Sequence, residues 1–141
     1  MKHLHIPDVG EEFVLARPWS FTLYNEYRNT DVRDALGLNL VPEFVALETP
    51  APFETWEQRY ARQDKLRDMM WSVTLPPGTK LLIDRIYIRK GAADYSSLSF
   101  YVTECPLQAL TPTKKGGGFK KGRRRFWAKL ADVNNIVYVG E

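Results

Sequence analysis

Apolar and polar residues alternate along much of the chain, which is the pattern of β-strands that bury one face. The first such stretch runs from Gly10 to Tyr24, where the odd positions are apolar. The residues expected to face inward there are Phe13, Leu15, Trp19, Phe21 and Leu23. Pro18 cannot donate a hydrogen bond to a ladder, so this stretch is predicted to form an edge strand or to contain a bulge.

The same alternation returns in the second half of the chain. It predicts strands over residues 71–75, 81–89, 98–103, 125–130 and 136–139. Segments with turn-forming residues separate them, including Pro76-Pro77-Gly78-Thr79 and a long loop rich in Pro, Gly and Lys before residue 125. A proline-bounded segment earlier in the chain, residues 44–47, is also expected to form a short strand.

A short helix is predicted over residues 30–37. The sequence Asn29-Thr30-Asp31 is a typical helix start, and Gly37 is a residue at which helices often stop. Its inward positions would be Val32, Ala35 and Leu36.

The main helix is predicted over residues 53–70. Thr55 suits the N-cap position, and Gln58 follows three residues later, as in a capping box. Phe53, Trp56 and Tyr60 share one face, whereas the opposite face is charged. This pattern favours an amphipathic helix that packs its aromatic face on the sheet.

These elements predict an α+β domain of five to six strands, built as a small, strongly bent antiparallel sheet or barrel. The segment Leu130–Asn135 before Ile136 resembles the closing element of SH3-like barrels, in which a short helical turn precedes the last strand. The resemblance covers the last two-thirds of the chain and implies an SH3-like barrel. Residues that mark peptide-binding SH3 domains are missing, so binding of proline-rich peptides is not implied. Residues 1–141 are expected to form a single domain.

Composition places the expected domain in a reducing compartment. The single cysteine, Cys105, has no partner for an internal disulfide. The N-terminal residues contain no apolar stretch of a signal peptide, and no apolar run approaches the length of a membrane span. We therefore expect a cytoplasmic protein that has no membrane partner.

Charge is distributed unevenly along the chain. The net charge is only +3, but seven of the 20 basic residues lie between Lys114 and Arg125, where there is no acidic residue. The rest of the chain contains 13 basic and 17 acidic residues. Four glycines in the same interval predict that residues 111–125 form a flexible basic loop. Such segregation favours contact with a polyanion. The seven residues are Lys114, Lys115, Lys120, Lys121, Arg123, Arg124 and Arg125.

Three predicted strands would also present aromatic rings beside cations on one face. The inward positions are expected to be Leu82, Ile86 and Ile88, then Leu98, Phe100 and Val102, then Phe126, Ala128 and Leu130. The outward positions then include Arg85, Tyr87, Arg89, Tyr101, Arg125, Trp127 and Lys129. Rings that stack bases and cations that meet phosphates are typical of proteins that bind single-stranded nucleic acid. The alternative is that these rings pack within the protein, or that the main helix covers them.

The sequence therefore favours a non-catalytic module that binds RNA or single-stranded DNA and needs no cofactor or metal. It contains no recognisable metal-ligand spacing and no nucleophile or phosphate-loop motif. One alternative is a small protein-interaction or inhibitor module, similar to accessory proteins of phages and plasmids, whose basic loop docks on an acidic partner or a nucleic-acid-binding groove. A third hypothesis is a nucleotide or nucleic-acid enzyme that uses Asp84, Asp94 or Asp132.

Overall fold

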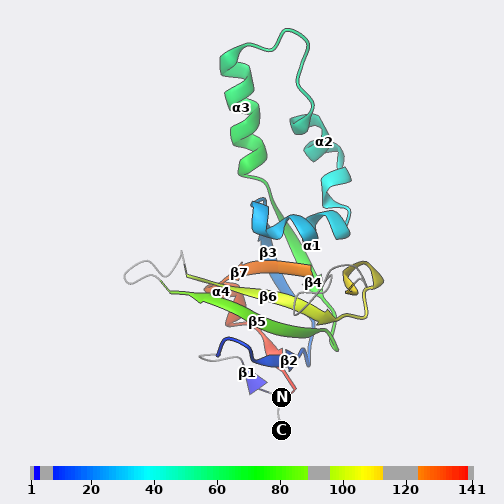
Figure 1. The fold of residues 1–141 in the computed structure, drawn as a ribbon. Helices are drawn as coiled ribbons and strands as arrows, with labels where there is room; N and C mark the ends of the chain where they lie inside the picture. Colours follow the sequence, from blue (N-terminus) through cyan, green and yellow to red (C-terminus); the bar gives the residue numbers. More distant parts are fainter. Residues whose placement is uncertain (1, 4–7, 89–95, 113–123, 140–141) are drawn as a thin grey trace.

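The computed structural model describes residues 2–3, 8–88, 96–112 and 124–139, whose strands form antiparallel sheets (Figure 1). The largest sheet has four strands in the order β2-β5-β6-β7, formed by Glu12–Val14, Lys80–Tyr87, Ser97–Glu104 and Arg124–Lys129. A second sheet pairs β3 (Trp19–Tyr24) with β4 (Met70–Leu75). A third pairs β1 (Lys2–His3) with β8 (Val137–Tyr138).

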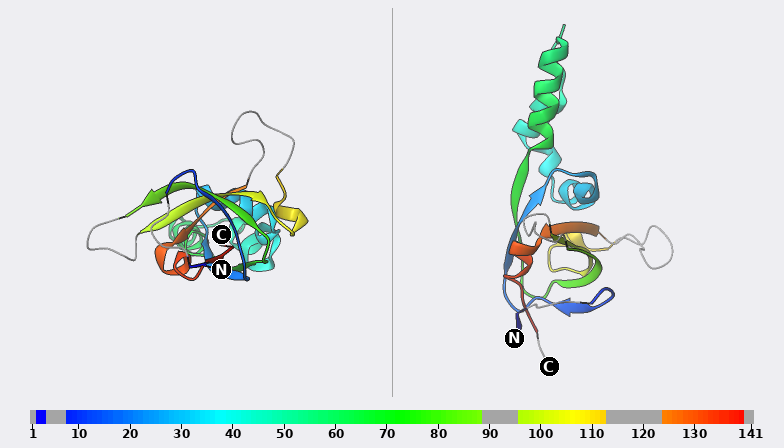
Figure 2. Two further views of the ribbon diagram at one scale, coloured as in Figure 1. Left: turned by 90° about the horizontal axis from the view of Figure 1, so that it is seen from below. Right: turned by 90° about the vertical axis from the view of Figure 1, so that its left-hand side faces the viewer.

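Four α-helices accompany these sheets among the described residues. They are α1 (Thr30–Ala35), α2 (Pro42–Glu48), α3 (Trp56–Arg67) and α4 (Leu130–Val133). Short 3₁₀ turns occur at η1 (Tyr27–Asn29), η2 (Leu38–Leu40) and η4 (Gln108–Leu110). Helix α1 packs along β7, whereas α2 and α3 extend away from the sheets as an elongated arm (Figure 2).

The mixed α and β composition is confirmed, but the SH3-like barrel is not. The described strands do not close into a barrel, since β3 and β4 pair only with each other and β7 ends the four-stranded sheet. The predicted helical turn before the last strand is present as α4. Asp132 of this turn fixes it to β3, because its Oδ2 accepts a hydrogen bond of 3.0 Å from the Thr22 N–H and its carbonyl accepts one of 2.8 Å from Trp19 Nε1.

A cluster of aromatic rings lies at the centre of the core. Trp19 stacks on Phe21 at 4.5 Å, and Phe21 stacks on Phe126 at 4.9 Å between ring centroids. Phe100 of β6 completes the group, 5.4 Å from Phe126. All the odd positions predicted to face inward between residues 13 and 23 are buried. Burial of apolar and aromatic surface of this size is the main stabilising contribution to the fold.

The main helix occupies residues 56–67 and does not pack on the sheet, contrary to the sequence prediction. The predicted capping box is present: Thr55 Oγ1 accepts from the Gln58 N–H, and the Gln58 side chain accepts from the Thr55 N–H. However, Phe53, Trp56 and Tyr60 are exposed, and no residue of α3 is buried. The helix instead packs against α2. Arg62 joins the two by pairing with Glu54 at 2.7 Å and donating to the Leu47 carbonyl at 2.7 Å.

Two further predictions from the pattern are wrong. Residues 44–47 belong to helix α2 and not to a strand, because Pro42 stands in the first turn, where its fixed backbone angle favours a helix. In β5, the register shifts between Ile83 and Arg85. Before this shift, Leu81 and Ile83 face the core and Leu82 lies on the opposite face, so the prediction that Leu82 points into the core is wrong. Ile88, also predicted to point inward, is exposed.

Candidate nucleic-acid interface

The three strands predicted to carry the aromatic and basic residues are neighbours in the sheet. Residues that lie directly opposite one another in antiparallel strands share a face, so the register defines three rows across β5, β6 and β7. The rows are Leu82–Tyr101–Arg125, Arg85–Ser99–Trp127 and Tyr87–Ser97–Lys129. We call this side of the sheet the outer face, because the core residues of the same strands lie on the other side.

Three cations on the outer face have no ion-pair partner among the described residues. These are Arg85, which is exposed, and Arg125 and Lys129, which are half-buried. Arg124 was also predicted for the site, but it lies on the opposite face of β7, the face that carries Phe126 and Ala128. There it pairs with Asp31 of α1 at 3.5 Å. The outer face therefore holds positive charge that nearby described carboxylates do not neutralise through ion pairs.

Two of the three predicted stacking rings are already engaged within the protein. Tyr101 lies on β6, the middle strand of the three, but only 3% of its surface is exposed. Trp127 stacks on Tyr24 with a centroid distance of 5.2 Å and an interplanar angle of 5°, and its indole N–H donates to Glu26. Lys129 Nζ lies 4.8 Å from the Tyr24 ring centroid. For Tyr101 and Trp127, packing within the protein therefore accounts for the ring better than an open stacking surface.

Tyr87 is the predicted ring that stays accessible, with 37% of its surface exposed. Its hydroxyl accepts a hydrogen bond of 3.3 Å from Arg85 Nη1. This bond and the positive charges of Arg85 and Arg28 lower the pKa of Tyr87 below its ordinary value, although partial desolvation opposes the shift. The same contact raises the pKa of Arg85. The hydrogen bond to Arg85 is the main cause of the lowered pKa, and the guanidinium groups of Arg85 and Arg28 lie beside the ring at this end of the outer face.

Sequence reasoning missed two residues at this end, Tyr27 and Arg28 of η1. The guanidinium carbon of Arg28 lies 5.7 Å from the centroid of Tyr87 and 5.6 Å from that of Trp127. The Arg28 side chain is held by Glu26, with Nε 2.9 Å from Oε2. No periodicity could have found this contact, because η1 reaches β5 and β7 only through the tertiary fold.

Several predicted site residues lie outside the described residues, namely Arg89, Lys114, Lys115, Lys120, Lys121 and Arg123. Their role stays a prediction. In the sequence, the basic segment from Lys114 to Arg125 continues into β7, which begins at Arg124, and its last residue, Arg125, lies on the outer face.

The described carboxylates considered for catalysis have structural partners. Asp84 accepts a hydrogen bond of 3.2 Å from Ser99 Oγ, and Asp132 holds α4 on β3. Asp94 lies outside the described residues. Within the described segments, no group of three His, Cys, Asp or Glu residues could hold a metal ion. None of the helices in the described part of the chain combines the length and the apolar character needed to cross a membrane.

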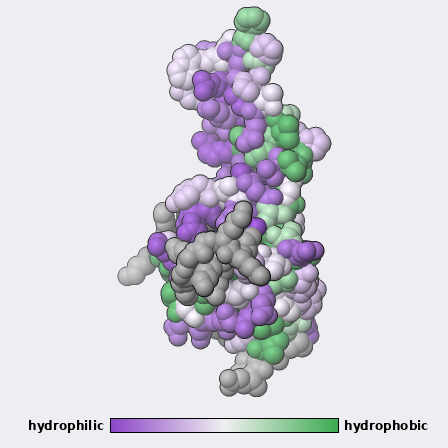
Figure 3. Space-filling view, turned by 45° about the vertical axis from the view of Figure 1, so that its right-hand side comes forward, coloured by the Kyte–Doolittle hydropathy of each residue, from purple (hydrophilic) through white to green (hydrophobic). Residues whose placement is uncertain are grey.

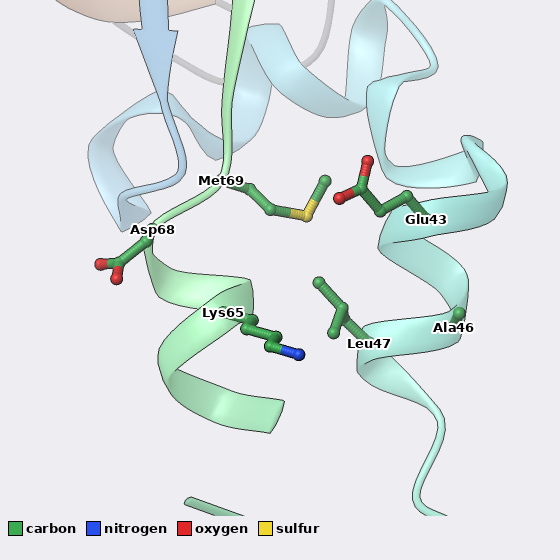
Figure 4. A pocket seen from close by; sticks show the side chains of 6 residues that line it. All are labelled: Glu43, Ala46, Leu47, Lys65, Asp68 and Met69. Atoms are coloured by element: carbon green, nitrogen blue, oxygen red, sulfur yellow. The ribbon is translucent and has the colours of Figure 1, made fainter. Parts of the chain in front are cut away.

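A second surface of interest is a groove of about 470 Å³ between α2 and α3. Figure 4 shows Leu47 and Met69 pointing into the space between the helices, with Glu43 and Lys65 at its sides. The arm is largely hydrophilic, with a small apolar area at its tip and a larger apolar patch partway along one side (Figure 3). Exposed side chains of the arm include those of Leu40, Val45, Phe53, Trp56 and Tyr60.

Comparisons with protein-family models, with curated proteins and with solved structures give no significant match.

Proposed function

We propose that this chain is a non-catalytic protein that binds RNA or single-stranded DNA, with phosphates contacting the outer face of β5–β7 and the basic run 114–123. The observation that carries the proposal is the placement of Arg85, Arg125 and Lys129 on one face, each without an ion pair among the described residues. Cations that are not paired internally are available to phosphates, and the release of counterions from the nucleic acid then favours binding.

The test is fluorescence anisotropy of labelled single-stranded RNA, single-stranded DNA and duplex DNA across a salt series. The double variant Arg125→Gln/Lys129→Gln should weaken single-strand binding. Its slope of log affinity against log salt should be shallower by about 1.4, since each lost contact to a single strand removes about 0.7.

The matched control is Arg59→Gln/Lys65→Gln, which removes two exposed cations from α3 and changes the net charge equally. This control should bind as the wild type does. Equal loss of affinity in both double variants would reduce the effect to overall charge and contradict the proposed interface. Absence of binding by the wild type at moderate salt would overturn the function itself.

A protein-interaction module is the second candidate function, and the arm is the observation that favours it. Several exposed apolar side chains, among them Val45, Trp56 and Tyr60, lie on this projecting element, and exposed apolar patches are typical of interaction surfaces. In this alternative the arm contacts a protein partner, and the basic residues meet acidic groups of that partner. It would be supported by one stoichiometric protein partner that survives nuclease treatment and is lost with Trp56→Ala/Tyr60→Ala in the arm.

A further inference from the structure

Two exposed tyrosines from distant parts of the chain meet at one guanidinium. Tyr27 lies in η1 and Tyr87 at the end of β5, and they are 79% and 37% exposed. The guanidinium carbon of Arg28 lies 5.9 Å from the centroid of Tyr27 and 5.7 Å from that of Tyr87. Both rings therefore offer surface to a ligand beside a fixed positive charge.

Arg28 is held in place before any ligand arrives. Both its backbone N–H and its Nε donate to the carboxylate of Glu26, at 3.2 and 2.9 Å. Glu26 also accepts the indole N–H of Trp127, which in turn stacks on Tyr24. The half-buried rings of Tyr24 and Trp127 thus support the Glu26–Arg28 pair on which Tyr27 and Tyr87 lie. A cation that is already ordered costs a ligand less entropy on binding.

The chemistry of this cluster suits an unpaired base with its phosphate. A tyrosine ring stacks any base, whereas the neighbouring guanidinium groups of Arg28 and Arg85 can donate to phosphate oxygens. Glu26 balances the charge of Arg28, so the net positive charge beside the rings comes from Arg85 and favours an anionic ligand. A base inside a duplex is already stacked on both sides and cannot lie on the rings without leaving the helix.

We propose that Tyr27 and Tyr87, held against Arg28, form a subsite that stacks an unpaired base, so that the outer face selects single-stranded over duplex nucleic acid. This inference rests on the proposed function, since it names the part of the nucleic acid that this end of the face recognises.

The experiment measures the affinity of the full chain for three labelled probes at one moderate salt concentration. The probes are a thymidine 12-mer, a 12-mer of the same charge whose sugars lack bases, and a 12-base-pair duplex. The wild type should bind the thymidine probe most tightly. Tyr27→Ala should weaken that binding by about 5- to 150-fold, the range expected for loss of one aromatic stacking partner. Its affinity for the base-free probe should change little.

Three variants complete the design. Tyr27→Phe keeps the ring and should bind as the wild type does, whereas Tyr87→Ala should also lose the preference for bases. Tyr60→Ala removes an exposed tyrosine from the arm and should have no effect.

The outcomes separate this inference from the proposed function. Salt-dependent binding that requires Arg125 and Lys129 but is unchanged in Tyr27→Ala and Tyr87→Ala would overturn the stacking subsite alone. Equal loss of affinity for the base-free probe would overturn it too, because the rings would then serve only to position cations. If the wild type bound none of the probes, the proposed function would fall, and the subsite with it.

Discussion

Replacing Asn29 by alanine should destabilise the sheet at its β7 edge. Asn29 is almost completely buried beside this strand. Its Oδ1 accepts a hydrogen bond of 2.8 Å from the N–H of Trp127, and its Nδ2 donates one of 3.0 Å to the carbonyl of Tyr24. No other described strand pairs with this edge of β7, so alanine would leave the Trp127 N–H without a protein partner.

The expected loss of unfolding free energy is the sum of what the Trp127 N–H and the Tyr24 carbonyl lose when the Asn29 side chain is removed. An unsatisfied buried N–H costs about 1–3 kcal/mol. The Tyr24 carbonyl loses less, roughly 0.5 kcal/mol, because it still accepts the N–H of Glu26 at 2.9 Å. The Asn29→Ala variant should therefore lower the free energy of unfolding by about 1.5–3.5 kcal/mol, a large share of the stability of a typical domain.

Urea unfolding followed by tryptophan fluorescence measures this change. Asn134→Ala is the control, because Asn134 is exposed at the end of α4. The control should stay within about 0.5 kcal/mol of the wild type. If Asn29→Ala unfolded at the wild-type urea concentration with an unchanged slope, the argument that Asn29 stabilises the edge of β7 by accepting the Trp127 N–H would be refuted.

Three further perturbations test the turn after α1, the arm and the outer face. Gly37 has φ of +74° with no atom near an added Cβ, so Gly37→Ala should cost about 1 kcal/mol of unfolding free energy through backbone strain alone. Gly37→Asn should cost less in the same urea assay, and equal costs would point to packing instead. The hydrogen bond from Arg62 lowers the pKa of Glu54 from its ordinary value of 4.5. The pair therefore stabilises the arm above that value, and α3 should loosen as pH falls through the folded-state pKa. NMR titration should show this change, and Arg62→Gln should raise the pKa of Glu54; a Glu54 carboxyl that titrates at its ordinary value in the wild type would contradict the contact. The pKa of Tyr87 is lowered from the ordinary 10.0, so the difference between the absorbance titrations of the wild type and Tyr87→Phe should show a tyrosine that ionises below that value, and Arg85→Gln should raise that pKa. An unchanged titration in Arg85→Gln would show that the hydrogen bond does not set it.

Much of the sheet could be predicted because its pattern is local. Strand β3 has a buried residue at every second position, and the inward residues of β6 and β7 were identified in the same way. The start of α3 was also predictable, since Thr55 and Gln58 form the capping box between neighbours in the sequence.

The arm could not be predicted from the same kind of pattern. Periodicity identifies the aromatic face of α3, but it does not say whether that face meets the sheet or solvent. Trp56 and Tyr60 stack on each other at 4.7 Å on the exposed helix. This contact removes part of their apolar surface from water, although neither ring is buried in the core.

The candidate site was predictable only in its strand residues. Alternation correctly placed Arg85, Arg125 and Lys129 on the outer side of neighbouring strands. It could not show that Trp127 would be covered by Tyr24, or that Arg28 would reach Tyr87, because both contacts join segments far apart in the sequence.

The pairing of β3 with β4 has a consequence for how the chain acquires its structure. Tyr24 and Met70 are the paired residues nearest to the segment that connects the two strands, and residues 25–69 separate them in the sequence. The two strands therefore cannot form as a hairpin around a tight turn. Closing so long a segment slows folding, but its entropic cost grows only with the logarithm of length. Asn29, Val32 and Phe44 tie the beginning of the segment to the strands, since all three are buried and the Phe44 ring lies 6.0 Å from that of Trp71 in β4. Residues 48–53, which join α2 to α3, are exposed and are the part left free to vary. This part of the chain should accept insertions or deletions during evolution with little effect on the sheets.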